Sequence, residues 1–264
     1  WDFMTTDKLQ VEHPVFEQLS KYSEFYGYLA FSMMSFVSMG TQSVLNIDTY
    51  VYPSMQGTLD SIKDILIKGR INDAYALLRK YYDAAVINIY TNLYLDENAS
   101  IDNFVVEKIE NWLQGKEQLP TIQVMNTYIE KSSKSASIYK LLHKDKRYSE
   151  LKDRCNDNVH YNFYHNVLLN NSQTFLENRN PILNRFSKDL ENIFILHLSY
   201  LFSIKEQYMM SSDYVDALDC EAMPEPDSQY FVAPFIQEVF DNVIKKNRND
   251  LATEIKSNTS MRLE

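Results

Sequence analysis

Two side chains able to act on a phosphodiester lie close together near the middle of the chain. Arg154 carries a forked guanidinium, which can hold a phosphate through paired hydrogen bonds. His160 follows six positions later, and an imidazole can give or take a proton at neutral pH. RNA can be cleaved without a metal ion when a base removes the 2′-hydroxyl proton and a cation stabilises the phosphorane. The pair therefore indicates metal-independent RNA cleavage, with Asn158, Tyr164 and Asp157 as supporting residues.

A basic stretch leads into this pair. Between Lys131 and Arg154, eight basic residues meet three acidic ones, a net charge of +5, whereas the remaining 18 basic and 33 acidic residues carry −15. Such asymmetry favours a local contact with an anion or a nucleic acid. We expect Lys144, Lys146 and Arg147 to bind the phosphates of RNA or of a nucleotide. The alternative is a solvated, charged turn between two helices.

The spacing sets a geometric condition on this hypothesis. Six residues along a continuous helix rotate by about 600°, which leaves the two side chains roughly 120° apart. They would share a face if the run from Asn156 to Asn158, which consists of poor helix formers, loosens the helix. A two-fold dimer could instead bring together two copies of each residue.

The segment from Tyr148 to His160 resembles the Arg-x(4–6)-His motif of HEPN domains. The resemblance implies an all-α fold, a nucleotide-binding or RNA-cleaving activity of the toxin–antitoxin or antiphage-defence type, and pairing of two copies across the motif helices. It also implies a protein partner such as an antitoxin. Cys155 departs from the pattern, because the residue after the arginine is frequently Asn or another polar residue. This departure argues against an active nuclease more than against the HEPN-like fold.

Other interpretations of the same residues stay open. His160 could be a hydrogen-bonded structural histidine, and Arg154 could form a surface ion pair with Glu150, four residues earlier. A chain without an effective pair would be a catalytically inactive binding or interaction module. A third class is a membrane-associated effector that inserts residues 25–47, which carry no charge.

Composition and motifs exclude several other classes. The formal charge of −10 argues against a general nucleic-acid or lipid coat. Cys155 and Cys220 lie far apart and without CxxC spacing, which fits a reducing cytoplasm rather than a zinc site or a disulfide scaffold. His160 and His165 lack metal-ligand spacing, and the chain has no Walker loop, dinucleotide fingerprint or G-x-S-x-G turn. We therefore expect no cofactor and no metal.

Helical periodicity dominates the rest of the chain. Five glycines and seven prolines provide little turn chemistry for a sheet. Apolar residues recur at helical spacing in several runs. They predict helices over about 14–26, 59–66, 70–95, 103–113, 120–142, 181–204 and 232–244, with Gly69 and Gly115 as C-terminal caps. Residues 148–177 form a segment of mixed polarity. Pro53 and Gly57 predict a break before the second helix.

These elements predict one all-α domain over residues 1–264, a bundle of about eight helices similar to a HEPN domain. We expect residues 1–13 and 257–264 to be flexible ends and residues 219–228 to be a surface loop. Residues 25–47 are predicted to form a buried helix and not a membrane span, because serines and glycines interrupt them. The broad apolar stripes of 70–95 and 181–204 favour a homodimer.

Overall fold

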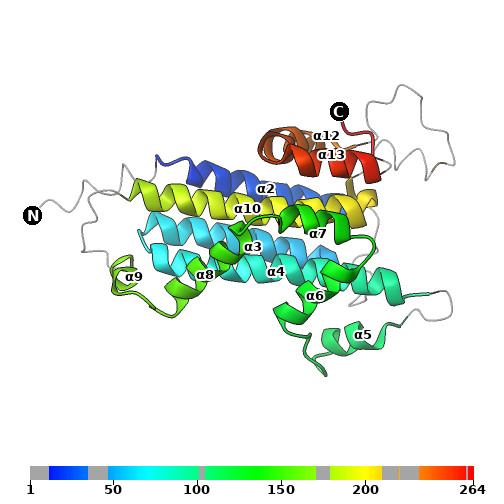
Figure 1. Cartoon of the computed structure of the whole chain (residues 1–264), viewed down its shortest axis with the longest axis horizontal. Helices are drawn as coiled ribbons and strands as arrows, with labels where there is room; N and C mark the ends of the chain where they lie inside the picture. Colours follow the sequence, from blue (N-terminus) through cyan, green and yellow to red (C-terminus); the bar gives the residue numbers. More distant parts are fainter. Residues whose placement is uncertain are drawn as a thin grey trace, which may run out of the picture. The chain divides into compact units, whose positions relative to one another are not determined.

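The computed structural model describes residues 12–34, 47–100, 105–170, 179–209, 220, 232–259 and 261–264. These residues form helices and no β-strand, which confirms the all-α class. They include eleven α-helices where about eight were expected. The elements in Figure 1 are α2 (Val15–Met34), α3 (Ile47–Ile67), α4 (Ile71–Asn98), α5 (Glu107–Leu113), α6 (Ile122–Lys131), α7 (Ala136–Leu142), α8 (Arg147–Val159), α9 (Tyr164–Leu168), α10 (Asn180–Ile204), the 3₁₀-helix η2 (Glu206–Met209), α12 (Pro234–Val239), the π-helix η3 (Phe240–Lys245) and α13 (Asn249–Asn258).

The higher count comes from runs that were predicted as single helices. The predicted helix over 120–142 is interrupted between α6 and α7, where Ser132 has an extended backbone and donates its hydroxyl to Glu97. Ser135 donates its hydroxyl to the carbonyl of Ile129. Serine side chains that bond to other groups in this way favour helix ends over helix interiors. The predicted helix over 232–244 likewise divides into α12 and η3.

The predicted break at Pro53 and Gly57 is wrong, because α3 continues through both residues. Proline in a helix removes one backbone hydrogen bond and strains the preceding turn. Here Tyr52, Met55 and Leu59 are buried at helical spacing. Burial of one apolar face therefore outweighs the local preference for a break. The predicted glycine caps are confirmed: Gly69 and Gly115 have positive φ angles of 73° and 69°, directly after α3 and α5.

The helices form two compact units. The first comprises Trp1–Gly27, Tyr50–Ala85 and Asp145–Phe194, and the second comprises Tyr28–Thr49, Val86–Lys144 and Ile195–Glu264. Each of α2, α3, α4 and α10 contributes residues to both units. That residues 1–264 form a single domain stays a prediction.

In the first unit, segments of α2, α3, α4 and α10 lie side by side around an aromatic core (Figure 1). Tyr26 is fully buried, and its hydroxyl pairs with that of Tyr81 at 2.8 Å. The ring of Phe194 packs edge-on against Tyr26 and stacks on Tyr22. Each tyrosine thereby buries its ring while Tyr26 and Tyr81 satisfy each other's hydroxyl, as buried polar groups require.

The core of the second unit holds a polar network. The buried Asp48 carboxylate accepts hydrogen bonds from the side-chain amides of Asn88 and Asn92 at 2.5 and 3.1 Å. The Nε2 atom of His197 lies 2.9 Å from Oδ1 of Asn88. Burial raises the pKa of Asp48 and lowers the pKa of His197 to about 3. His197 is therefore neutral at physiological pH and donates to Asn88 from Nε2.

The predicted flexible ends and the predicted loop are described only in part. In residues 257–264, predicted to be flexible, α13 extends to Asn258 and Leu263 is buried against the protein. In the other predicted flexible end, 1–13, His13 pairs with Asn184, and residues 1–11 lie outside the described residues. The predicted loop 219–228 also lies outside them, except for the exposed Cys220.

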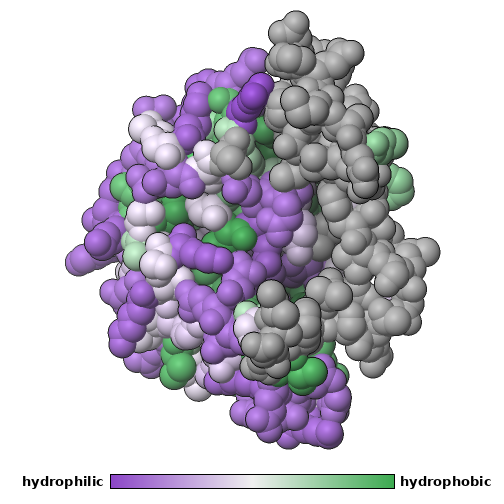
Figure 2. All heavy atoms as spheres, turned by 90° about the vertical axis from the view of Figure 1, so that its right-hand side faces the viewer, coloured by the Kyte–Doolittle hydropathy of each residue, from purple (hydrophilic) through white to green (hydrophobic). Residues whose placement is uncertain are grey.

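No helix in the described part of the chain has the length and apolar character needed to cross a membrane. Of the uncharged segment 25–47, α2 ends at Met34, α3 begins at Ile47, and residues 35–46 are not among those described. Figure 2 shows one face of the molecule on which described residues are mainly hydrophilic and hydrophobic ones form small, separate areas. The apolar stripes of α4 and α10, which suggested a homodimer, are buried within the chain itself, as at Leu78 and Leu198.

The His197 network predicts a defined loss of stability in acid. Because its pKa is about 3 in the folded chain and 6.5 without burial, the unfolded chain takes up a proton first as the pH falls. The free energy of unfolding should therefore decrease by about 1.4 kcal/mol per pH unit between these two pKa values through this residue alone. The replacement His197→Gln keeps a donor for Asn88 and removes the titration.

Chemical denaturation of both proteins from pH 7 to pH 4 measures this effect. His197→Gln should be less stable than the parent protein at pH 7, and the difference should shrink as the pH falls. Asp48 is present in both proteins, so its opposite contribution cancels. His160→Ala, which removes an exposed histidine, serves as the control and should be as stable as the parent protein at pH 7. A constant difference between His197→Gln and the parent protein would contradict the prediction.

Candidate functional site

Helix α8 carries Arg154 toward the buried side of α10. Tyr148, Leu151 and Cys155 are buried at intervals of three and four residues, so this face of α8 packs inward. Arg154 lies next to this face and donates from Nε and Nη2 to the two oxygens of Asp189, at 2.8 and 2.5 Å. The Asp189 side chain is only 2% exposed, and Glu150 approaches Arg154 more loosely, at 3.8 Å. The guanidinium fork is thus occupied by a buried carboxylate.

The pair with Asp189 gives Arg154 a structural contact inside the fold. Hydrogen bonds from Arg154 to Asp189 raise the pKa of the guanidinium, and the hydroxyl of Tyr75 also donates to Asp189, at 3.4 Å. A bidentate pair of this kind is strong, and its carboxylate could not be left unpaired without a large free-energy cost. The predicted phosphate-holding role of Arg154 would require that pair to open. The sequence also allowed an ion pair between Arg154 and Glu150. Arg154 does form an ion pair, but Asp189 lies closer to it than Glu150 does.

His160 lies at the C-terminal end of α8 and is exposed. The helix runs unbroken through Asn156, Asp157 and Asn158, so the loosening that would bring Arg154 and His160 onto one face does not occur. No hydrogen bond between described side chains joins the two residues. The spacing of six positions therefore separates them, as about 600° of helical rotation implies.

The predicted supporting residues instead hold the corner between α8 and α9. Asn158 is buried and donates to the carbonyl of Arg154, while its own carbonyl accepts from the Asn72 amide at 2.8 Å. The Asn72 amide also reaches the carbonyl of Asn166, at 3.3 Å. These bonds tie the end of α8 and the start of α9 to α4.

Asp157 completes the corner with both its side chain and its backbone. Its carboxylate accepts from the side chain of Asn162 at 2.8 Å, and its carbonyl accepts from the side chain of Asn166 at 2.9 Å. Tyr161 lies between Asp157 and Asn162 in the chain and has a φ angle of 50°. Residues other than glycine seldom adopt this left-handed conformation. Such strain persists where the surrounding contacts enforce it, and it recurs at functional sites.

The corner presents apolar side chains to solvent. Tyr164 is 77% exposed, Phe163 53% and Tyr161 48%. Val159 and Val167 are also exposed, and the ring of His165 stacks on that of Phe163. We call Val159, Tyr161, Phe163, Tyr164 and Val167 the aromatic corner. The segment that carries it, residues 159–167, contains no Asp, Glu, Lys or Arg.

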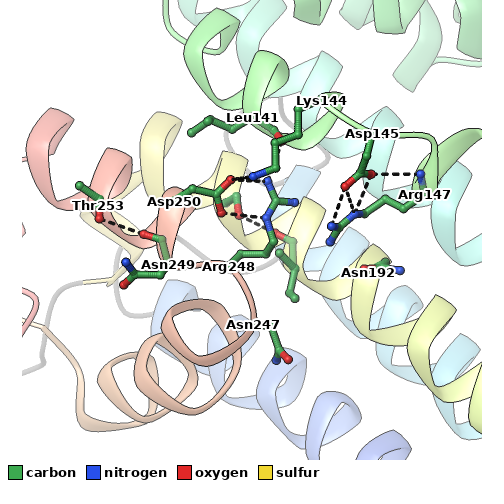
Figure 3. Close-up of polar contacts among 12 residues, drawn as sticks. Leu141, Lys144, Asp145, Arg147, Asn192, Asn247, Arg248, Asn249, Asp250 and Thr253 are labelled. Carbon is green, nitrogen blue, oxygen red and sulfur yellow. Dashed lines mark hydrogen bonds and ion pairs between the residues drawn. The ribbon is translucent and has the colours of Figure 1, made fainter.

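The predicted RNA-binding cations are mostly engaged elsewhere. Lys144 contacts Asp250 at 2.6 Å, and the guanidinium of Arg147 grips its neighbour Asp145 through both oxygens (Figure 3). Lys146 is exposed. Much of the positive charge counted in the sequence is thus neutralised by ion pairs, as in the alternative of a solvated charged turn.

No group of three or more metal-ligating side chains is placed to hold a metal ion among the residues that the structure describes. The Cys155 thiol is buried, which raises its pKa to about 12 and keeps it protonated at neutral pH. Cys155 fills the core where the HEPN pattern frequently has a polar residue. The site thus offers neither a metal nor an activated thiol within the described residues.

Sequence analysis missed Tyr161 and Phe163, and it missed Asn72, Asn166 and Asp189 as the residues that hold the site. One signal was available for the aromatic corner: three aromatic residues crowd into four positions, 161–164, without helical spacing. No signal pointed to Asn72 or Asp189, because their partners lie 86 and 35 positions away.

The ion pair predicts effects of different size on stability for two alanine variants. Arg154→Ala leaves the buried Asp189 carboxylate without its cation, so the free energy of unfolding should fall by about 2–4 kcal/mol. His160→Ala removes an exposed side chain and should change it by less than about 0.5 kcal/mol. Urea denaturation measures both values. An Arg154→Ala protein as stable as the parent would contradict the structural role of the ion pair and favour the predicted phosphate-holding role of Arg154.

The strain at Tyr161 predicts an unusual glycine substitution. Tyr161→Gly should leave the free energy of unfolding unchanged or raise it by up to about 1 kcal/mol, because glycine adopts positive φ without strain. The matched control Tyr164→Gly replaces an exposed tyrosine within α9 and should lower it by about 1 kcal/mol. Equal losses in both variants, measured by thermal or urea denaturation, would show that Tyr161 is not strained.

Comparison with known proteins gives no relative from which a function could be transferred. The chain matches no protein-family model, no curated protein and no solved structure. The resemblance to HEPN domains is neither supported nor opposed by these comparisons, and it rests on the segment from Tyr148 to His160. Function therefore has to be inferred from the geometry of the side chains.

Proposed function

We propose that this protein is a helical interaction module that binds a partner protein through the aromatic corner between α8 and α9. The observation that carries the proposal is the outward placement of Tyr161, Phe163 and Tyr164 on a strained turn that buried asparagines hold in place. Exposed apolar groups on a rigid frame are characteristic of protein-binding surfaces, because little conformational entropy is lost on binding. Tyrosine is also among the residues that contribute most to such interfaces.

The chemistry of the corner favours a protein over RNA. Nucleic-acid affinity depends on Lys and Arg contacts to phosphates, and residues 159–167 contain neither. Among the cations of α8, Arg154 pairs with Asp189, Arg147 with Asp145, and Lys152 lies 6.0 Å from the centre of the Tyr82 ring. Aromatic rings can stack on bases, but here most of the cations that would hold the strand are engaged.

Overall charge indicates the character of the partner. The chain carries a formal charge of −10, so long-range attraction favours a basic protein and disfavours a second copy of the same chain. We infer a partner that presents an apolar patch surrounded by Lys and Arg residues. An antitoxin-like protein would be one such partner.

Endoribonuclease activity of the toxin or antiphage-defence type stays a prediction. It would require Arg154 to leave Asp189, or His160 to act with another cation. The exposed position of His160 is compatible with proton transfer, but no described cation contacts it. The interaction module is therefore the function that the geometry supports better.

A photo-crosslinking experiment tests the proposal. Tyr164 is replaced by a photoreactive phenylalanine derivative in the full chain, which is expressed in its source cells and irradiated. We expect a covalent adduct with a protein, because this side chain is the most exposed of the aromatic corner. The same derivative at Tyr50, which is 58% exposed on α3 of the same unit, is the control and should not give that adduct.

Each outcome distinguishes one class of function. Adducts with RNA, accompanied by RNA cleavage that His160→Ala abolishes, would replace the proposal with the nuclease hypothesis. An adduct with a second copy of the chain would support the predicted homodimer and contradict the proposed partner. Identical adducts from positions 164 and 50, or none from either, would show that the aromatic corner has no specific protein partner.

A further inference from the structure

A second cluster of charges, independent of the aromatic corner, lies in the second unit where α7 packs against α13. Arg248 immediately precedes α13 and is buried, with its side chain 4% exposed. Its Nε and Nη2 atoms donate to the two oxygens of Asp250, each at 2.9 Å, and Nη2 also donates to the carbonyl of Leu141 at 2.6 Å. Figure 3 shows these bonds, which link the end of α7 to the start of α13.

The positive charge in this cluster exceeds the negative charge. Lys144 also donates to Asp250, at 2.6 Å, so two cations share one carboxylate. Hydrogen bonds from Arg248, followed by the one from Lys144, hold the pKa of Asp250 well below its usual range. Asp250 is therefore ionised at neutral pH, and one positive charge of the three groups stays uncompensated. The N-terminal dipole of α13 adds to this positive potential.

One nitrogen of the buried guanidinium lacks an acceptor. Nη1 of Arg248 is buried and has no hydrogen-bond partner among the described residues. A buried charged donor without an acceptor is costly, and in native proteins it usually indicates a bound water or ion. The nearby η3 is a π-helix, a rare element that recurs at functional sites, and its Ile244 carbonyl accepts from the backbone of Arg248 at 2.7 Å.

We propose that Lys144 and Arg248 form a binding site for a phosphate group, either as the free ion or as a phosphate monoester. Asp250 keeps its two bonds to Nε and Nη2 of Arg248 and so fixes the guanidinium. The Lys144 side chain, which is half exposed, turns its amine from Asp250 to the incoming anion. Nη1 of Arg248 then donates to a second oxygen of the anion. The anion then supplies both the missing charge and the missing acceptor.

Titration of the full chain tests the site. Isothermal titration calorimetry with sodium phosphate, at constant ionic strength against sodium chloride, should show saturable binding of phosphate. Lys144→Ala should weaken phosphate binding by about tenfold or more, the loss expected from one charge-assisted hydrogen bond. Lys140→Ala removes an exposed charge from α7 without touching the cluster, and it should change affinity by less than about twofold. The parent protein's thermal transition should rise with phosphate and not with chloride.

Two further experiments distinguish a free phosphate ion from a phosphate monoester and test a second variant of the site. AMP and adenosine are titrated separately: tighter binding of AMP than of inorganic phosphate assigns a monoester, and equal or weaker binding assigns the free ion. Arg248→Lys keeps the charge but loses the second donor edge, and it should also weaken phosphate binding by about tenfold or more. If circular dichroism shows that this variant is unfolded, the phosphate affinities of Lys144→Ala and Lys140→Ala test the proposal without it. Equal affinity in those two variants, or no difference between phosphate and chloride, would overturn the proposal.

Discussion

Burying the Asp189 carboxylate on α10 costs free energy unless a cation pairs with it, and Arg154 provides that cation from α8. The pair fixes the rotation of α8 about its axis, which in turn places Asn158 against Asn72 and turns Asp157 toward α9. The α8–α9 turn then has little freedom, and Tyr161 accepts a left-handed backbone. The exposure of the aromatic side chains follows from this sequence of constraints rather than from any property of the turn alone.

The same principle operates in the second unit with different residues. Asp48 is buried beside two asparagine amides, and His197 donates to one of them. Arg248 joins the carbonyl end of α7 to the carboxylate of Asp250. In both units, polar side chains on neighbouring helices satisfy each other inside an apolar core. Helices packed only by leucine and phenylalanine could slide or rotate with little penalty, whereas these bonds form in one arrangement.

The sequence predicts the helical class well because it depends on local periodicity. Leu59, Ile62 and Leu66 recur at helical spacing and are buried, and Gly69 ends α3 as predicted. Local rules failed where tertiary packing overrides them, as at Pro53, and where a side chain's partner lies far along the chain. Arg154 illustrates the second case: its pairing with Asp189, 35 positions away, could not be predicted from the sequence, whereas its phosphate-binding role stays a prediction. Nothing in the local sequence distinguishes an arginine that binds a ligand from one that neutralises a buried acid.

The network that shapes the α8–α9 turn consists largely of asparagine side chains. Amides do not ionise in the physiological pH range, and a hydrogen bond between neutral groups is far less sensitive to dissolved salt than an exposed ion pair. The bonds among Asn72, Asn158 and Asn166 therefore keep the same geometry across compartments that differ in acidity or ionic strength. The proposed recognition surface would therefore keep the same form under these conditions, and the amount of protein present would set how much partner it binds.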